Sequence, residues 1–123
     1  MDLRLELVII PVTDVDRAKA FYVEQLGFTA DHDRVVTPAL RFVQLTPPGS
    51  ACSIAFGRGL TDAPPGSIKG LQVVTTDIEA TQRELRERGL DPGEIDDQAW
   101  GRFLTVEDPD GNHWAIQQIV RPA

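Results

Sequence analysis

The sequence predicts an α+β fold built from two copies of a βαβββ unit. The first observation behind this prediction is a pattern of cap, helix and terminating glycine that occurs twice. Asp14 and Asp77 lie 63 positions apart, and Gly27 and Gly89 lie 62 apart. Such similarity at a fixed offset is typical of internal duplication. The second observation is that short β-like runs, separated by Pro and Gly turn residues, follow each copy.

The first predicted strand covers residues 3–12. Apolar and charged residues alternate at its start, and the run becomes continuously apolar by Ile10. This pattern indicates a strand that begins half exposed and ends buried on both faces. Pro11 favours an edge position or a bulge, because proline cannot donate a ladder hydrogen bond.

A helix is predicted after this strand, with Asp14 as its N-cap and Asp16 in its first turn. Gly27 follows the helix where a left-handed C-terminal residue is favoured. Its apolar stripe consists of Val15, Ala18, Phe21, Tyr22 and Leu26.

Two β-like runs follow, over residues 41–45 and 50–56, and the turn Pro47-Pro48-Gly49 between them predicts a hairpin. His32 precedes them in a polar run that we interpret as a solvated loop. Residues 60–69, with Pro64-Pro65-Gly66, form the best candidate linker.

The second half repeats this order. Residues 71–75 are predicted as a strand, Asp77 caps a helix that ends at Gly89, and Glu79/Arg83 and Glu84/Arg88 are i,i+4 pairs. A final hairpin is predicted over residues 103–107 and 112–120, because Asp108-Pro109-Asp110-Gly111 is a strong turn sequence.

Composition excludes several classes of protein. The chain has 123 residues, 41% of them hydrophobic and 25% charged, as in an ordinary globular protein. Its net charge of −7 repels phosphate and argues against a nucleic-acid partner. No apolar stretch approaches the ~18 residues of a membrane span, and no signal peptide is recognisable. Cys52, the single cysteine, excludes an internal disulfide. We expect one domain over 1–123, in the cytoplasm, with no membrane partner.

The chain resembles the vicinal oxygen chelate superfamily in four segments taken together, namely Val12–Val15, Phe21-Tyr22, Leu26–Phe28 and Val106–Asn112. The superfamily includes glyoxalase I, extradiol dioxygenases, fosfomycin-modifying enzymes and bleomycin resistance proteins. The resemblance covers residues 5–120 and implies modules over about 1–59 and 70–123, whose curled mixed sheets surround a cavity. It also implies a homodimer, sometimes with exchanged modules. Because members do unrelated jobs, function must be judged from the cavity.

The metal-dependent members hold a divalent ion with His and Glu side chains from four strands. The resemblance assigns those positions here to Leu7, Ile54, Leu71 and Ala115. None of these side chains donates to a cation, so we predict no metal and no other cofactor.

Two nearby residues keep a metal or an acid–base role open. Glu6 adjoins Leu7, but a one-residue shift points it to the opposite face unless a bulge at Pro11 restores it. His113 shares the face of Ala115, yet one ligand falls short of the usual three. His113 is the one catalytic candidate.

Other candidate groups have ordinary structural explanations. Cys52 has no histidine nearby in sequence, and a buried inert thiol is the default. The four aspartates of the second module, at 96, 97, 108 and 110, are placed in turns, with structural rather than acid–base roles. Asn112 completes the last turn. Trp100, beside Gly101, is either a lid packed on the core or a stacking surface for a flat ligand.

The leading hypothesis is a metal-free homodimer that binds a hydrophobic or aromatic small molecule in its cavity, resembling the bleomycin resistance proteins, which sequester a drug. The alternative is a lyase, isomerase or dioxygenase relative that uses His113 or an unconventional metal site. A third possibility is an accessory domain with a filled cavity and no ligand. The predicted ligand-binding residues are Leu7, Ile9, Ile54, Phe56, Leu71, Val73, Trp100, His113, Ala115 and Gln117.

Overall fold

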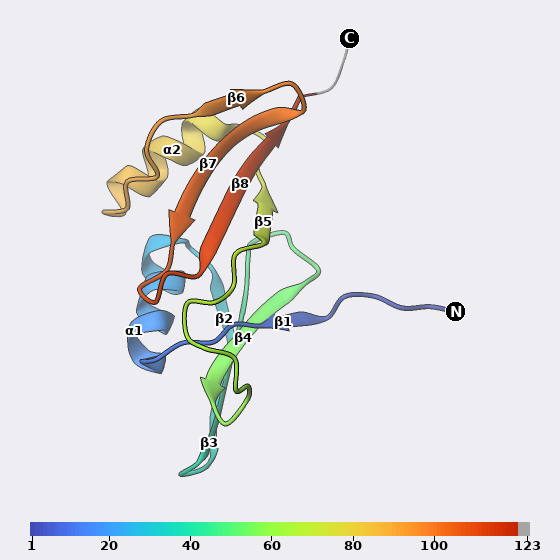
Figure 1. Cartoon of the computed structure of the whole chain (residues 1–123), viewed down its shortest axis with the longest axis vertical. Helices are drawn as coiled ribbons and strands as arrows, with labels where there is room; N and C mark the ends of the chain where they lie inside the picture. Colours follow the sequence, from blue (N-terminus) through green and yellow to red (C-terminus); the bar gives the residue numbers. More distant parts are fainter. Residues whose placement is uncertain (121–123) are drawn as a thin grey trace.

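The structure, a computed structural model, describes residues 1–120 and contains two four-stranded sheets (Figure 1). The first sheet consists of β1 (Leu7–Ile9), β2 (Thr29–Thr37), β3 (Leu40–Thr46) and β4 (Ser53–Arg58). The second consists of β5 (Leu71–Val74), β6 (Asp96–Gln98), β7 (Gly101–Glu107) and β8 (His113–Ile119). The strand orders are β1-β4-β3-β2 and β5-β8-β7-β6, so the two halves repeat the same topology. The predicted duplicated α+β fold is therefore confirmed.

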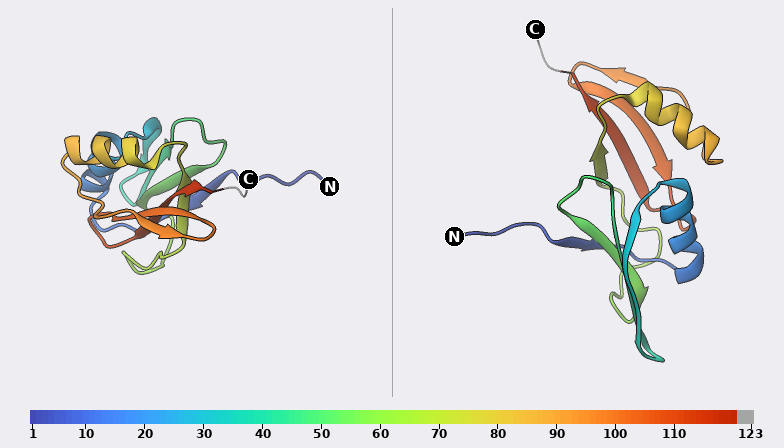
Figure 2. Two further views of the ribbon diagram at one scale, coloured as in Figure 1. Left: turned by 90° about the horizontal axis from the view of Figure 1, so that it is seen from above. Right: turned by 180° about the vertical axis from the view of Figure 1, so that it is seen from behind.

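The two sheets follow one another along the length of the molecule, as the views of Figures 1 and 2 show. In each sheet the first strand pairs in parallel with the last, and the other pairs are antiparallel. Among residues 1–120 the two sheets do not pair with each other, so β1 and β5 are free edges there. In this single chain they are therefore not closed around a common cavity.

Both predicted helix starts are confirmed. The first helix comprises α1 (Val15–Ala20) and a π-helical turn η1 (Phe21–Gln25), and the second is α2 (Ile78–Glu87). The carboxylate of Asp14 accepts from the Arg17 amide at 3.1 Å, and that of Asp77 accepts from the Ala80 amide at 3.0 Å. Each of these caps satisfies one amide that lacks a partner within its helix. No helix among residues 1–120 is long and apolar enough to cross a membrane.

Three strand predictions need correction. The strand expected over residues 3–12 forms only at Leu7–Ile9, because within residues 1–120 no strand lies beside the residues before Leu7 to pair with them. His32 lies in β2, not in a loop, and pairs opposite Gln44. Asp96 and Asp97, expected in a turn, form the short edge strand β6.

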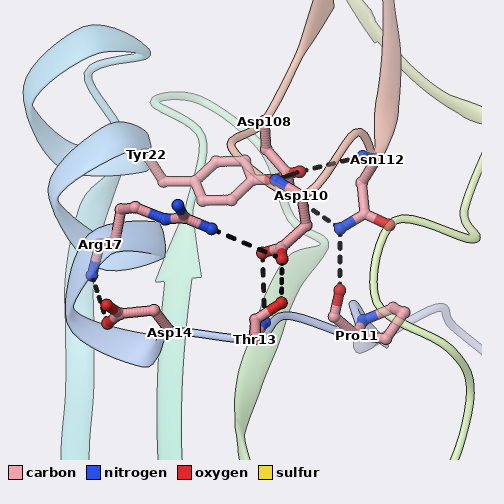
Figure 3. A network of polar contacts seen from close by, with 8 residues as sticks. All are labelled: Pro11, Thr13, Asp14, Arg17, Tyr22, Asp108, Asp110 and Asn112. Atoms are coloured by element: carbon pink, nitrogen blue, oxygen red, sulfur yellow. Dashed lines mark hydrogen bonds and ion pairs between the residues drawn. The ribbon is translucent and has the colours of Figure 1, made fainter.

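A buried polar network joins the first helix to the turn before β8 (Figure 3). The Tyr22 hydroxyl donates to Asp108 Oδ2 at 2.8 Å and accepts from Trp114 Nε1 at 3.0 Å. Asn112 Nδ2 donates to the Pro11 carbonyl at 2.9 Å and to Asp108 Oδ2 at 2.8 Å. Burial, together with the negative charge of Asp108, raises the pKa of the Tyr22 hydroxyl well above its usual range. The hydroxyl therefore remains a proton donor at any physiological pH.

A second set of contacts continues this network toward the solvent and completes the joint between the first helix and the turn before β8. The backbone amide of Thr13 donates to Asp110 Oδ2 at 3.2 Å, its hydroxyl donates to Oδ1, and Arg17 lies 3.7 Å from the same carboxylate. The Gly111 amide donates to the Asp108 carbonyl at 2.9 Å, which confirms the predicted hairpin turn. Asp108, Asp110 and Asn112 therefore lie in the predicted turn, where Asp108 Oδ1 accepts from the amides of the other two residues.

An ion-pair cluster ties the β2–β3 hairpin to α1. The Arg41 guanidinium donates to both oxygens of Asp33, at 3.0 and 2.9 Å, and to Asp16 at 2.9 Å. Lys19 adds a contact of 2.9 Å to Asp33. Hydrogen bonding from Arg41, and then from Lys19, lowers the pKa of Asp33 to about 2.

Candidate functional site

The second sheet has one face that packs against α2 and one that does not. Trp114 and Ile116 of β8 are buried on the helix side, as predicted. Side chains alternate along a strand, so His113, Ala115 and Gln117 lie on the opposite side. We call the side of each sheet turned away from the helices its open face.

In the first sheet the predicted lining residues divide between the two faces. Val8 pairs with Ile54 in the parallel β1–β4 ladder, so Ile54 shares the face of Val8, whereas Leu7 and Ile9 lie on the open face. Phe56 is fully buried, and its ring lies 5.8 Å from that of Tyr22 on the helix side. The expectation that Ile54 and Phe56 share a face with Leu7 and Ile9 is therefore wrong. The register of the edge strand β1 against β4 decides which residues share a face, and the sequence does not reveal that register.

The same division occurs in the second sheet. Leu71 pairs with Trp114, which places it on the helix side, and the pairing of Val73 with Ile116 does the same. Gln72 pairs with Ala115 and faces the open side. The family resemblance assigned the ligand position to Leu71, which lies one residue before Gln72, the residue on the open face. The alternation of half-buried and exposed residues along β5 carries this information, but four residues are too few to reveal it in sequence.

The open face of the second sheet carries a chain of amide hydrogen bonds that the sequence did not predict. Gln72 Nε2 donates to Gln117 Oε1 at 2.6 Å, and Gln117 Nε2 donates to the Trp100 carbonyl at 3.1 Å. Trp100 lies in the turn between β6 and β7 with 63% of its surface exposed. The lid alternative predicted for Trp100, in which it packs on the core, is therefore not seen in this chain.

His113 lies at the end of the open face near the α2–β6 loop. It pairs opposite Glu107 across the β7–β8 ladder. Together with Asp91 and Thr105 these residues line a shallow groove of about 370 Å³. The groove is polar and contains both a histidine and carboxylates, so it offers groups that can exchange protons.

The free edge of β5 borders a cavity of about 320 Å³ at the junction of the two sheets. Three predicted ligand-binding residues, Ile54, Leu71 and Val73, line this cavity. Cys52 also lines it as a partly buried free thiol. Apart from Trp100, in the turn between β6 and β7, the structure therefore places the predicted lining residues in three regions. Ile54, Leu71 and Val73 line the junction cavity, Phe56 is in the core, and Leu7, Ile9, His113, Ala115 and Gln117 are on the open faces.

The residues present do not fit a divalent metal ion. At the open-face positions that correspond to the family's ligand positions, Leu7 and Ala115 offer no donor atom, and Gln72 offers only a neutral amide. Across residues 1–120, no group of three or more His, Cys, Asp or Glu side chains is arranged to hold a metal. Glu6 is exposed next to the short strand β1, and His113 and Glu107 provide two candidate donors, one fewer than a site usually needs.

Comparison with known proteins identifies similar chains over almost the whole length. The family model for the Glyoxalase/Bleomycin resistance protein/Dioxygenase superfamily matches residues 4–116. TnmS3, an antibiotic binding protein from Streptomyces sp. CB03234, is 34% identical with a TM-score of 0.87, covering 97% of this chain and 98% of that one. A glyoxalase/bleomycin resistance protein from the same organism is 35% identical, with a TM-score of 0.81 and coverage of 94% and 100%. The uncharacterized protein YetH of Bacillus subtilis (strain 168) is 24% identical over 119 residues, 90% of this chain and 94% of YetH.

Proposed function

This chain belongs to the glyoxalase/bleomycin resistance protein/dioxygenase superfamily, and we propose that it binds an aromatic or otherwise hydrophobic small molecule on its open faces without transforming it. The observation that carries this proposal is the chemistry around Ala115. Ala115 of β8 pairs opposite Gln72 of β5, at positions where the family resemblance would place a metal ligand. Apolar surface with a few polar groups is typical of small-molecule sites. The similarity to TnmS3, an antibiotic binding protein, supports the binding of a small molecule.

We further propose that two copies of the chain close the site between them. Ile9, Val74 and Ile119 lie on the open faces with 38%, 67% and 46% of their surfaces exposed. Apolar side chains exposed on one side of a molecule mark an interaction surface. A second open face placed against the first would bury them and enclose a ligand. The proposal includes a cytoplasmic location, where the free thiol of Cys52 would stay reduced.

Binding is tested with daunorubicin, a planar aromatic antibiotic, and with bleomycin. Titration calorimetry should give a saturable complex with at least one of them. Chromatography and mass spectrometry should then recover the drug unchanged after prolonged incubation. Ala115→Trp would fill the open face and should weaken binding by roughly tenfold or more, about 1.4 kcal/mol. Ala39→Trp, at an exposed turn, is the matched control.

Binding that Ala115→Trp leaves unchanged would contradict the placement on the open face. Conversion of the drug to a new product would contradict sequestration.

A second candidate function is acid–base catalysis, favoured by the pairing of His113 opposite Glu107 beside the polar groove. In this mechanism the His113 imidazole would take a proton from the substrate and return it to the product, while Glu107 stabilises the imidazolium. It predicts turnover that His113→Gln abolishes. Turnover of an identified substrate that survives this substitution would exclude His113 as the base.

A further inference from the structure

A separate apolar pocket of about 230 Å³ lies on the helix side of the second sheet, the side opposite Ala115. It is bounded by α2 on one side and by residues of the first module on the other. Its floor consists of the buried side chains Phe28, Val106, Trp114 and Ile116. Leu85 of α2 forms one wall and Leu26 the other.

The size of this pocket limits what it can hold. An apolar cavity of about 150 Å³ accommodates benzene, and drug-sized ligands need roughly 300 Å³ or more. A volume of about 230 Å³ therefore suits a compact molecule with one or two rings. Aromatic side chains on the floor, Phe28 and Trp114, favour a flat aromatic ligand.

The lining side chains carry three polar groups, which are the hydroxyls of Thr75 and Thr81 and the indole N–H of Trp114. The two hydroxyl oxygens lie 2.7 Å apart. The Thr81 hydroxyl donates to the Asp77 carbonyl at 3.0 Å, so its single proton is already used. The proton between the two oxygens must then belong to Thr75. Thr75 Oγ1 in turn accepts from the Asp77 amide at 3.4 Å.

The lining side chains consequently have lone pairs to offer but no free donor. Both threonine protons are used within the protein, and Trp114 Nε1 donates to the Tyr22 hydroxyl at 3.0 Å. A ligand with an N–H or O–H group would find an acceptor at Thr81. A ligand that carries only a carbonyl or a ring nitrogen would find no side-chain donor, and an unpaired buried polar group is unfavourable.

We propose that this pocket, here called the helix-side pocket, binds a one- or two-ring aromatic molecule carrying a single hydrogen-bond donor, such as an indole or a phenol. The donor points to the threonine pair, and the ring lies on Phe28 and Trp114. This site goes beyond the proposed function, because it uses the opposite side of the sheet from Ala115 and Gln72.

The experiment uses indole and 1-methylindole as probes, followed by chemical shifts of the ¹⁵N-labelled full-length protein. Indole should bind with a Kd of roughly 0.1 to 1 mM, as expected for so small a ligand. Its shift changes should gather at Thr75, Thr81, Leu85 and Val106. 1-Methylindole lacks the donor and should bind about five- to tenfold more weakly, the effect of one hydrogen bond.

Variants at Thr81 test the role of the hydroxyl. Thr81→Val should remove the preference for indole over 1-methylindole, whereas Thr81→Ser, which keeps the hydroxyl, should retain it. Thr105→Val, on the open face of the same sheet, is the matched control and should change nothing. Ala115→Trp should leave indole binding intact, which separates this proposal from the one for the open face.

Three results would overturn the proposal. Equal affinity for the two probes would exclude the hydrogen bond to Thr81. Shift changes centred on Ala115 and Gln117 would place indole on the open face. The absence of saturable shifts up to a concentration of about 10 mM, well above the expected Kd, would show that the pocket holds no such ligand.

Discussion

The hydroxyl of Tyr22 donates a hydrogen bond of 2.8 Å to Oδ2 of Asp108, although the two residues lie 86 positions apart in the chain. Tyr22 belongs to the helix of the first module, and Asp108 begins the turn before the last strand of the second. Asp108 Oδ1 also accepts from the amides of Asp110 and Asn112, each at 2.9 Å. One buried carboxylate therefore shapes the turn and fixes it to the other module, which sets how the two sheets follow one another.

Removing this hydroxyl should destabilise the protein. Tyr22→Phe keeps the ring but leaves the Trp114 N–H without its acceptor and deprives Asp108 of one donor. Leaving a buried group unpaired costs roughly 1–3 kcal/mol, more for a charged one. Urea unfolding should show a free energy of unfolding lower by that amount. Phe42→Leu, outside the network, is a control for the change of an aromatic residue. An unchanged free energy for Tyr22→Phe would mean that water replaces the hydroxyl.

The stability of the β2–β3 hairpin should depend on acid pH through Asp33. The pKa of this carboxyl falls from 3.8 to about 2 because Arg41 and Lys19 donate to its charged form. A lowered folded-state pKa adds stability that is fully present above the unfolded value and lost as pH falls through the folded value. The free energy of unfolding of the wild type should thus decline between about pH 4 and pH 2. Asp33→Asn should be less stable at neutral pH and should show a shallower decline over that interval.

The matched control is Asp2→Asn, which removes one charge at the exposed N-terminus. It should reproduce the wild-type pH profile. A profile for Asp33→Asn that parallels the wild type would assign the acid dependence to other carboxylates.

Most of the fold was predictable from local sequence, but the faces of the strands were not. Asp14 and Asp77 as caps, and the turn at Asp108, are local signals that depend on neighbouring amides. Strand β2 is exposed along its whole length, and β6 is exposed as well, so neither has the alternation that marks a half-buried strand. The faces of Leu71 and Gln72 depend on pairing with β8, some 40 residues further along, which a short edge strand does not encode.

The candidate site shows the same limit. The alternation of Trp114 with Ala115 was predictable because β8 is long and its buried residues are large. The amide chain from Gln72 to Trp100 was not, because it joins three segments through side-chain contacts.

A methyl group at Gly66 should destabilise the joint between the modules. Gly66 has a φ of +79°, and a Cβ there would lie 2.1 Å from the Asp110 carbonyl oxygen, a backbone atom that cannot yield freely. Gly49 has a φ of +81°, and no atom of the described residues 1–120 lies within 4 Å of such a Cβ. Gly49→Ala should therefore cost only the backbone strain, of order 1–2 kcal/mol. Gly66→Ala should cost clearly more in thermal or urea unfolding. Equal losses for the two variants would mean that the Asp110 turn moves aside at no cost.

A charge on the open face should break the proposed dimer, whereas the same charge elsewhere should not. Val74 and Val35 are matched valines, 67% and 63% exposed in the single chain, but Val74 lies on the open face and Val35 at the far end of the β2–β3 hairpin. Placing an unpaired carboxylate in an apolar interface is costly, so Val74→Asp should weaken self-association by roughly tenfold or more. Val35→Asp should leave it unchanged. Sedimentation velocity of both variants over a range of concentrations measures this difference directly. If both dimerise like the wild type, the two copies do not meet through the open face, and the ligand site proposed there would have to be completed within one chain.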